Sequence, residues 1–186
     1  MTTPVLLVID VLNDFTRQHS ADDRASLVGR INDLAALVRD ANGRVIWIRQ
    51  EFAADLHDAF LGMRRDNDRV TIAGTYGAQL DETLVVGRRD EIIIKKRYSA
   101  FFGTDLEAIL PPPAETVIVI CGLNTHACVR MSVIDAYQRD YEVVVATDAT
   151  RSYDREHHDV TLRYLGSRIA RLKTNAQIAA LFNLSA

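Results

Sequence analysis

The sequence contains few cysteines: only Cys121 and Cys128 are present among its 186 residues. They lie close together, one at the end of a predicted strand and the other in a predicted helix, which is unfavourable for a structural disulfide. Because disulfides are also rare in reducing compartments, we expect two free thiols. A redox pair is the alternative, although the spacing is not Cys-x-x-Cys.

The sequence also lacks blocks of like charge and any long apolar run. Its 22 Lys and Arg and 25 Asp and Glu residues are interspersed and give a formal net charge of −3, which leaves no electrostatic footprint for nucleic acid or an anionic membrane. The first residues show no basic leader or cleavage site, and their apolar run is too short to span a bilayer. We therefore expect a cytoplasmic protein whose partner is a small molecule.

The pattern of apolar residues predicts an α/β fold. With 48% hydrophobic residues, a chain of this length supports one core, so we expect a single domain over residues 1–186. Apolar runs alternate with segments of helical periodicity, which is typical of a three-layer α/β/α, Rossmann-like architecture with a mainly parallel sheet. Six strands are predicted, at Val5–Ile9, Arg44–Ile48, Glu91–Lys95, Thr116–Cys121, Glu142–Thr147 and Arg168–Lys173.

Helices are predicted between these strands. Ser20 and Asp23 resemble a capping box in front of a helix at 22–40. Thr125 is a good N-cap for a helix over 126–140, and a last helix is expected at 175–184. The long segment 51–82 is the least regular, and we expect it to border the functional site.

Three reactive residues fall where a parallel sheet of this kind binds ligands, at the carboxyl ends of its strands. Asp10 ends an apolar strand, Lys95 follows Ile92–Ile94, and Cys128 follows the strand that ends at Cys121. A turn-forming Asp and a solvated Lys are the ordinary interpretations of the first two. If both are buried, however, they neutralise each other and form a proton-handling nucleophilic site with the thiol.

Cys128 is predicted near the start of its helix. Unpaired N–H groups and the positive end of the helix dipole favour a thiolate there, so we expect a nucleophile; the alternative is a buried, inert Cys. His126 is the rival base, because Cys often pairs with His. Two helical steps subtend about 200°, so we expect His126 and Cys128 to point to opposite sides, with His126 as a supporting residue.

Three motifs occur in order along nearly the whole chain. Because of these motifs, the sequence resembles the isochorismatase-like cysteine hydrolase superfamily. This superfamily includes nicotinamidases, N-carbamoylsarcosine amidohydrolases and ureide hydrolases. The motifs are Leu7-Val-Ile-Asp10-Val-Leu-Asn-Asp14-Phe15, Lys95-Lys-Arg-Tyr-Ser99-Ala-Phe-Phe-Gly-Thr104 and Gly122-Leu-Asn-Thr-His-Ala-Cys128-Val129.

The resemblance implies a catalytic triad of Asp10, Lys95 and Cys128, with Lys95 rather than Lys96 at the position of the family's lysine. It also implies a cis peptide between Leu123 and Asn124, and an oxyanion hole formed by the backbone N–H groups of Asn124 and Cys128. The expected activity is hydrolysis of a C–N bond in a small amide, carbamoyl or ureide substrate through a Cys thioester. A homodimer or homotetramer is implied as well.

Metal binding is not expected, and neither is a cofactor. The nicotinamidases of the superfamily carry an Asp-x-His motif after the second strand, where this chain has Arg49-Gln-Glu-Phe52. His57 alone, or the pair His157-His158, does not make a site. This difference disfavours nicotinamide as the substrate.

Two other functions remain as alternatives. One is vinyl ether hydrolysis of the isochorismatase type, which Gln50 favours and Cys128 disfavours, since those relatives typically lack the Cys. The other is a binding homologue without turnover. For the substrate pocket, we expect contributions from Phe15, Gln50, Phe101 and Tyr153, with specificity set by the loop at 51–75.

Overall fold

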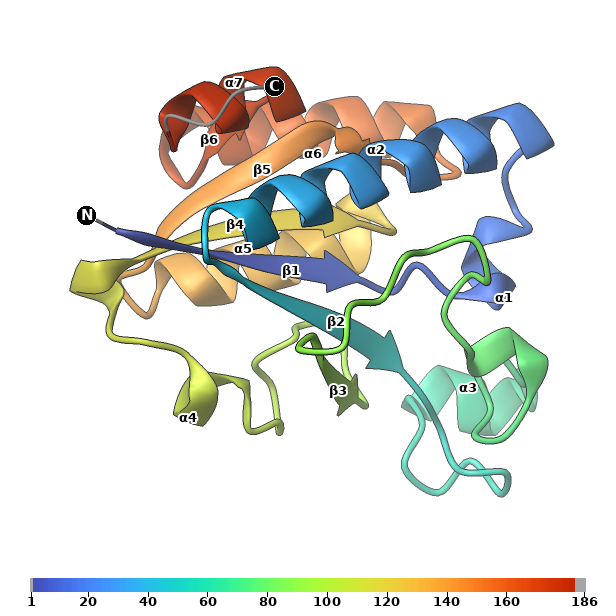
Figure 1. The fold of residues 1–186 in the computed structure, drawn as a ribbon. Helices are drawn as coiled ribbons and strands as arrows, with labels where there is room; N and C mark the ends of the chain where they lie inside the picture. The colour runs from blue at the N-terminus through green and yellow to red at the C-terminus, as the bar shows by residue number, and fades with distance from the viewer. Residues whose placement is uncertain (1, 183–186) are drawn as a thin grey trace.

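A six-stranded sheet forms the centre of the molecule in a computed structural model that describes residues 2–182. The strand order is β3-β2-β1-β4-β5-β6, and every neighbouring pair is parallel, which confirms the predicted fold class (Figure 1). The strands are β1 (Thr3–Ile9), β2 (Arg44–Gln50), β3 (Glu91–Lys95), β4 (Thr116–Gly122), β5 (Glu142–Thr150) and β6 (Arg171–Lys173).

Helices cover both faces of the sheet and complete the three layers. One core contains Leu6 and Val8 of β1 together with side chains of α2 (Ala21–Asp40) and α7 (Asn175–Leu181). The other contains Leu7 and Ile9 together with side chains of α5 (Arg130–Tyr137) and α6 (Arg155–Arg168). Successive residues of a strand point to opposite faces, so one buried strand supplies both cores.

The predicted strand positions are confirmed, with shifted ends. β1 starts earlier than predicted, and β2 and β5 run further, to Gln50 and Thr150. The sixth strand is shorter than predicted because α6 continues through Arg168, so β6 starts only at Arg171. Ser20 accepts a hydrogen bond from the Asp23 N–H, as the capping box predicts. The expected end of the last helix, at 184, lies outside the described residues.

The helix expected at 126–140 is divided into two parts. Residues Thr125–Val129 form a π-helical turn, η3, and α5 follows from Arg130. The N-cap is Asn124 and not Thr125. Thr125 lies inside the first turn, where its N–H donates to the carbonyl of Arg151. A π-turn is wider than an α-turn and is frequent at functional sites, and this one carries Cys128.

The irregular segment between β2 and β3 has a small core of its own. It contains α3 (Leu61–Asp66) and the short 3-10 turn η1 (Tyr76–Ala78), and its core consists of Phe52, Leu56, Ala59 and Ile72. In Figure 1, α3 lies beyond the carboxyl end of β2. The segment therefore lies at the edge of the sheet where ligands are expected to bind. Two further short turns complete the chain, α1 (Asn13–Thr16) and α4 (Leu106–Ile109), together with the 3-10 turn η2 (Pro113–Glu115).

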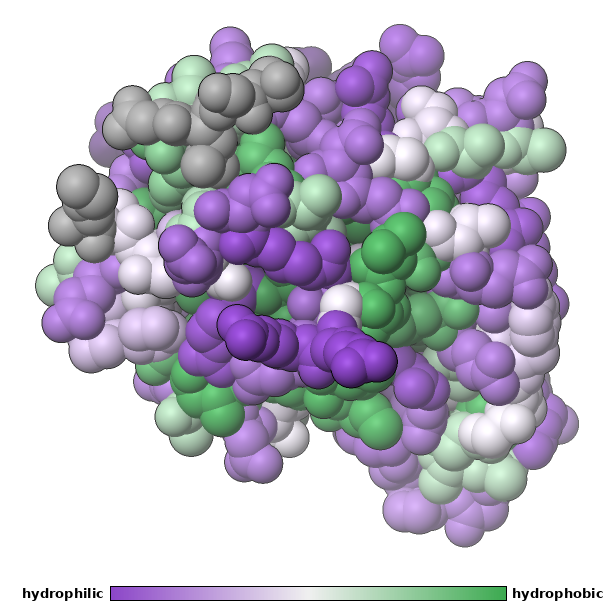
Figure 2. Space-filling view, viewed as in Figure 1, coloured by the Kyte–Doolittle hydropathy of each residue, from purple (hydrophilic) through white to green (hydrophobic). Residues whose placement is uncertain are grey.

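The surface is mixed in character. On the face drawn in Figure 2, hydrophilic side chains predominate and hydrophobic ones gather in a few places between them. Within residues 2–182, no helix combines the length and the apolar composition that crossing a membrane requires.

Candidate active site

The side chains of Asp10, Lys95 and Cys128 meet at the carboxyl edge of the sheet. The Nζ atom of Lys95 lies 2.7 Å from Oδ2 of Asp10 and 3.4 Å from Sγ of Cys128. Asp10 and Lys95 are fully buried, and Cys128 is 4% exposed. Three elements distant in the sequence thus bring an acid, an ammonium and a thiol into contact.

Asp10 is fixed by the strand next to its own. Its Oδ1 atom accepts a hydrogen bond of 2.7 Å from the Gln50 N–H at the end of β2, and its own N–H donates to the carbonyl of Ile48. Its φ of 50° lies in the left-handed region, which a residue with a side chain seldom adopts. The chain therefore turns sharply after β1, and the carboxylate points toward β3.

Adjacent lysines at the end of β3 have different surroundings. Lys95 is buried and also donates to the carbonyl of Arg97. Lys96 lies 2.9 Å from a carboxylate oxygen of Asp58, and its side chain is 40% exposed. Because neighbouring strand residues point to opposite faces, only Lys95 reaches Cys128.

The surroundings of Cys128 correct the expected thiolate. Burial raises the pKa of the Cys128 thiol, the Lys95 ammonium opposes this rise, and the Asp10 carboxylate adds to it. Since burial has the largest effect on this pKa, the resting group is a thiol beside a carboxylate. Cys121 is also free and buried, but it packs in the core under α2.

The turn before Cys128 brings β4 close to β1. The peptide between Leu123 and Asn124 is cis, as the resemblance implied. Gly122 has a φ of +109°, and a Cβ atom there would lie 2.2 Å from the carbonyl oxygen of Ile9. The Asn124 N–H donates to no backbone acceptor among residues 2–182, which leaves it available to a ligand above the Cys.

A pocket of about 540 Å³ opens above Cys128. Of the four residues expected to line it, Phe15, Gln50 and Tyr153 do so. The other residues lining it are Gln18, Phe60, Gly62, Met63, Asp68, Val70, Tyr98, Asn124, His126 and Ala127. The segment 60–70 thus supplies much of the wall, and a role of the loop at 51–75 in specificity stays a prediction.

Phe101 was wrongly expected in the pocket. Its side chain is 4% exposed and lies in the core that α5 covers. The guanidinium of Arg139 lies 4.9 Å from its ring centroid. Phe101 therefore packs in this core and is not among the residues that line the pocket.

His126 borders the same pocket as Cys128, although its ring contacts Ser152 and Tyr153 while the Cys128 sulfur contacts Lys95. The pocket lies over the beginning of the helix and not along one flank, so residues that point in different directions all border it. The Nδ1 atom of His126 lies 2.6 Å from the Ser152 hydroxyl, and its ring meets Tyr153 edge to face. Burial lowers the pKa of His126 and favours the neutral imidazole.

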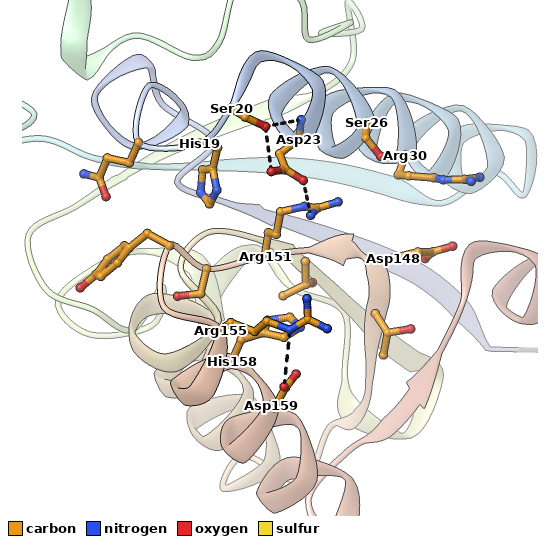
Figure 3. Close-up of a pocket in the computed structure, with 15 residues that line it drawn as sticks. His19, Ser20, Asp23, Ser26, Arg30, Asp148, Arg151, Arg155, His158 and Asp159 are labelled. Atoms are coloured by element: carbon orange, nitrogen blue, oxygen red, sulfur yellow. Dashed lines mark hydrogen bonds and ion pairs between the residues drawn. The ribbon is translucent and has the colours of Figure 1, made fainter.

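A second cavity, of about 670 Å³, adjoins this pocket and shares Gln18 and Tyr153 with it. Figure 3 shows that charged and hydroxyl side chains point into it, including Arg151, which is paired with Asp23 at 2.7 Å. His158, on the same wall, lies 2.7 Å from the Thr125 hydroxyl of the π-turn. No cysteine is among the residues that line this cavity, whereas Cys128 lines the first one.

The side chains near the pocket do not fit a metal ion. Among residues 2–182, no group of three or more His, Cys, Asp or Glu residues is arranged to hold one. After β2, where the resemblance would place ligands, Glu51 is paired with Arg49 at 2.7 Å. His57 lies 2.6 Å from Asp55 on the surface.

Comparisons with known proteins agree with the fold and the motifs. The model of the isochorismatase domain family matches residues 4–177. A protein of Arabidopsis thaliana named probable inactive nicotinamidase is 35% identical over 166 residues, which cover 84% of this chain and 85% of that protein. A ureidoacrylate amidohydrolase of Methylorubrum extorquens is 28% identical over 172 residues, which cover 80% of this chain and 69% of that protein.

Among solved structures, an isochorismatase family protein from Desulfovibrio vulgaris has the same fold. It superimposes with a TM-score of 0.88 at 23% identity, over 98% of this chain and all of that one. The match to the family model spans nearly the whole chain. The chain therefore belongs to the isochorismatase family, a family of hydrolases.

Proposed function

We propose that the protein is a cysteine hydrolase that cleaves a C–N bond of a small amide, carbamoyl or ureide substrate without a metal ion. The observation that carries this proposal is the contact of Lys95 with both Asp10 and Cys128 at the floor of an open pocket. A carboxylate, an ammonium and a thiol in contact provide a base, a counter-charge and a nucleophile.

In the proposed mechanism, Asp10 accepts the proton of the Cys128 thiol while the sulfur attacks the substrate carbonyl. The backbone N–H groups of Asn124 and Cys128 donate to the developing oxyanion. The C–N bond then breaks, and the leaving amine takes the proton from Asp10. A water molecule, deprotonated by Asp10, hydrolyses the thioester and releases the acid and the free thiol.

Lys95 has two roles in this scheme. Its charge offsets that of Asp10 in the resting state, and it lies within reach of the sulfur as the thiolate forms. Because burial keeps the resting sulfur protonated, deprotonation and attack are coupled. A thiolate, which oxidants would attack, therefore does not accumulate in the enzyme without substrate.

Specific observations favour two alternatives. Gln50 lines the pocket, as expected for an isochorismatase-type vinyl ether hydrolase, which would use Asp10 as an acid. The Arabidopsis relative is named probable inactive nicotinamidase, which favours a binding homologue without turnover.

An assay of the reaction products distinguishes the proposed function from these two alternatives. A panel of amides, carbamoyl amino acids and ureides is assayed for ammonia, and isochorismate is assayed for pyruvate. We expect ammonia release that is abolished in Cys128→Ala, persists in Cys121→Ala and is unaffected by a chelator. Turnover retained in a folded Cys128→Ala variant would refute the proposal, as would pyruvate release alone.

A further inference from the structure

Among its described lining residues, the pocket above Cys128 has one negatively charged residue and no Lys or Arg. Asp68 is the only Asp, Glu, Lys or Arg among its described lining residues, and it forms no ion pair within residues 2–182. His126 adds no positive charge, because burial and the neighbouring His157 lower its pKa. Asp68 is an exposed residue, and its carboxylate is the one formal charge that the described lining residues contribute to the pocket.

The cations around the pocket are engaged elsewhere. Lys95 lies below Cys128 and is neutralised by Asp10. Arg97 donates to the backbone carbonyls of Asp58 and Lys96. Arg151 faces the neighbouring cavity, where it pairs with Asp23 (Figure 3). A substrate carboxylate would thus lose its hydration without gaining a cationic partner, which is costly.

The rest of the wall is largely apolar. Side chains of Phe15, Phe60, Met63, Val70 and Tyr98 line the pocket. The rings of Phe60 and Tyr98 are in tilted contact, with an interplanar angle of 41° and a centroid distance of 4.8 Å, so they form adjacent parts of the wall. Such a wall takes up an apolar or aromatic body by removing its surface from water.

We propose that this pocket selects uncharged or cationic amides and ureides with an apolar body, that it discriminates against substrates carrying a carboxylate, and that Asp68 is the residue setting this charge preference. The inference rests on the proposed function and narrows its substrate class. It separates this chain from its relative named ureidoacrylate amidohydrolase, whose named substrate is an acid.

The test uses three aromatic amides that differ only in one substituent: 3-(hydroxymethyl)benzamide, 3-carboxybenzamide and 3-(aminomethyl)benzamide. Ammonia release gives kcat/KM for each amide with the wild type, Asp68→Asn, Asp68→Lys and Asp66→Asn. Asp66 is the matched control, because it lies in α3 on the surface, paired with Arg65, and does not line the pocket. The same amides are titrated calorimetrically into the Cys128→Ala protein.

We expect the wild type to favour the neutral and cationic amides over the carboxylate by at least tenfold in kcat/KM. Asp68→Asn should lower the preference for the cationic over the neutral amide, mainly through KM. Asp68→Lys should raise kcat/KM for the carboxylate, and Asp66→Asn should leave the ratios unchanged. Equal turnover of the carboxylate by the wild type would overturn the inference, as would equal shifts in the two Asn variants.

Binding distinguishes this inference from the proposed function. If none of the amides is hydrolysed while Cys128→Ala binds the neutral and cationic ones more tightly than the carboxylate, the proposed function fails and the charge preference stands. If none is hydrolysed and none is discriminated in binding, the inference is refuted. Cys128-dependent hydrolysis of the carboxylate alone would refute the inference and leave the proposed function intact.

Discussion

Lys95 and Asp10 form an ion pair of 2.7 Å with neither side chain exposed to solvent. Two buried charges are stable only as a pair, because each would be strongly disfavoured alone. The pair joins β3 to β1 across the intervening strand β2. The same two residues therefore contribute to the stability of the fold and to the candidate active site.

Lys95→Met should destabilise the protein by about 3–5 kcal/mol, since it leaves a buried carboxylate without its partner. The double variant Asp10→Asn with Lys95→Met should recover part of that loss. Urea unfolding at pH 7 measures both. Lys96→Met is the control, because the Lys96 side chain is 40% exposed and its partner Asp58 is only partly buried, and we expect a change of about 0–1 kcal/mol. Equal losses of unfolding free energy in Lys95→Met and Lys96→Met would contradict a special role of the buried ion pair.

The rate at which Cys128 is alkylated should depend on pH, and replacing its two neighbours Lys95 and Asp10 should change this rate in opposite directions. Because burial raises the pKa of the thiol, iodoacetamide should label Cys128 slowly at pH 7 and faster as the pH rises. Lys95→Met removes the charge that lowers this pKa and should slow labelling. Asp10→Asn removes one that raises it and should accelerate labelling while abolishing hydrolysis.

Cys121 serves as the internal control for this experiment. It is fully buried in the other core, so its labelling, followed by mass spectrometry, reports opening of the fold. A constant Cys128 labelling rate from pH 6 to pH 9 would show a thiolate and disprove the assignment of a protonated resting state.

Phe101 and Tyr153 should respond differently to replacement by Ala. Phe101→Ala opens a cavity in the core and should cost about 3–5 kcal/mol of unfolding free energy. Tyr153 is 59% exposed and lines the pocket, so Tyr153→Ala should change stability by at most about 0.5 kcal/mol and raise KM instead. Thermal unfolding and steady-state kinetics separate the two effects, and an unchanged KM in Tyr153→Ala would remove that residue from the pocket wall.

Asp81 should make stability depend on pH in the acidic range. Burial acts to raise its pKa, but the hydrogen-bonded Arg24 guanidinium and Thr83 prevail and lower it from 3.8 to about 2. Since the folded pKa lies below the unfolded one, this stabilisation is present above pH 4 and is lost as the pH falls toward 2.

Asp81→Asn should therefore cost about 1–2 kcal/mol at pH 7, a value reduced for the partial exposure of Arg24. The difference from wild type should shrink between about pH 4 and pH 2 in urea unfolding experiments. Asp66→Asn, in an exposed pair with Arg65, should show little change at either pH. If the difference in unfolding free energy between Asp81→Asn and the wild type were the same at pH 2 as at pH 7, an ionised Asp81 would not be its cause.

The sheet and the three meeting side chains could be predicted because their signals are local. Each strand is an apolar run followed by a polar residue, and parallel strands bring such ends to one edge. The π-turn could not be predicted in the same way, because a single wide turn leaves no periodicity in the sequence. That His126 borders the same pocket as Cys128 was not predicted either.

The direction of single side chains in loops also escaped prediction. Phe101 lies within the second motif but is buried in the core, and nothing in the order of residues 96–105 fixes the direction of its side chain. Met63 was missed because α3 has no buried residue and hence no apolar face to reveal it, and Asp68 lies in the irregular chain after this helix. A helix of this kind becomes recognisable only once the pocket it borders is seen.

The close approach at Gly122 has a mechanical consequence. With no room for a Cβ atom against Ile9, the strand that ends in the acid and the turn that carries the sulfur cannot slide past each other. The separation of these two groups is thus dictated by the main chain rather than by rotamers. We therefore expect a substitution of Gly122 to abolish activity, even though the carboxylate, the ammonium and the thiol would all still be present.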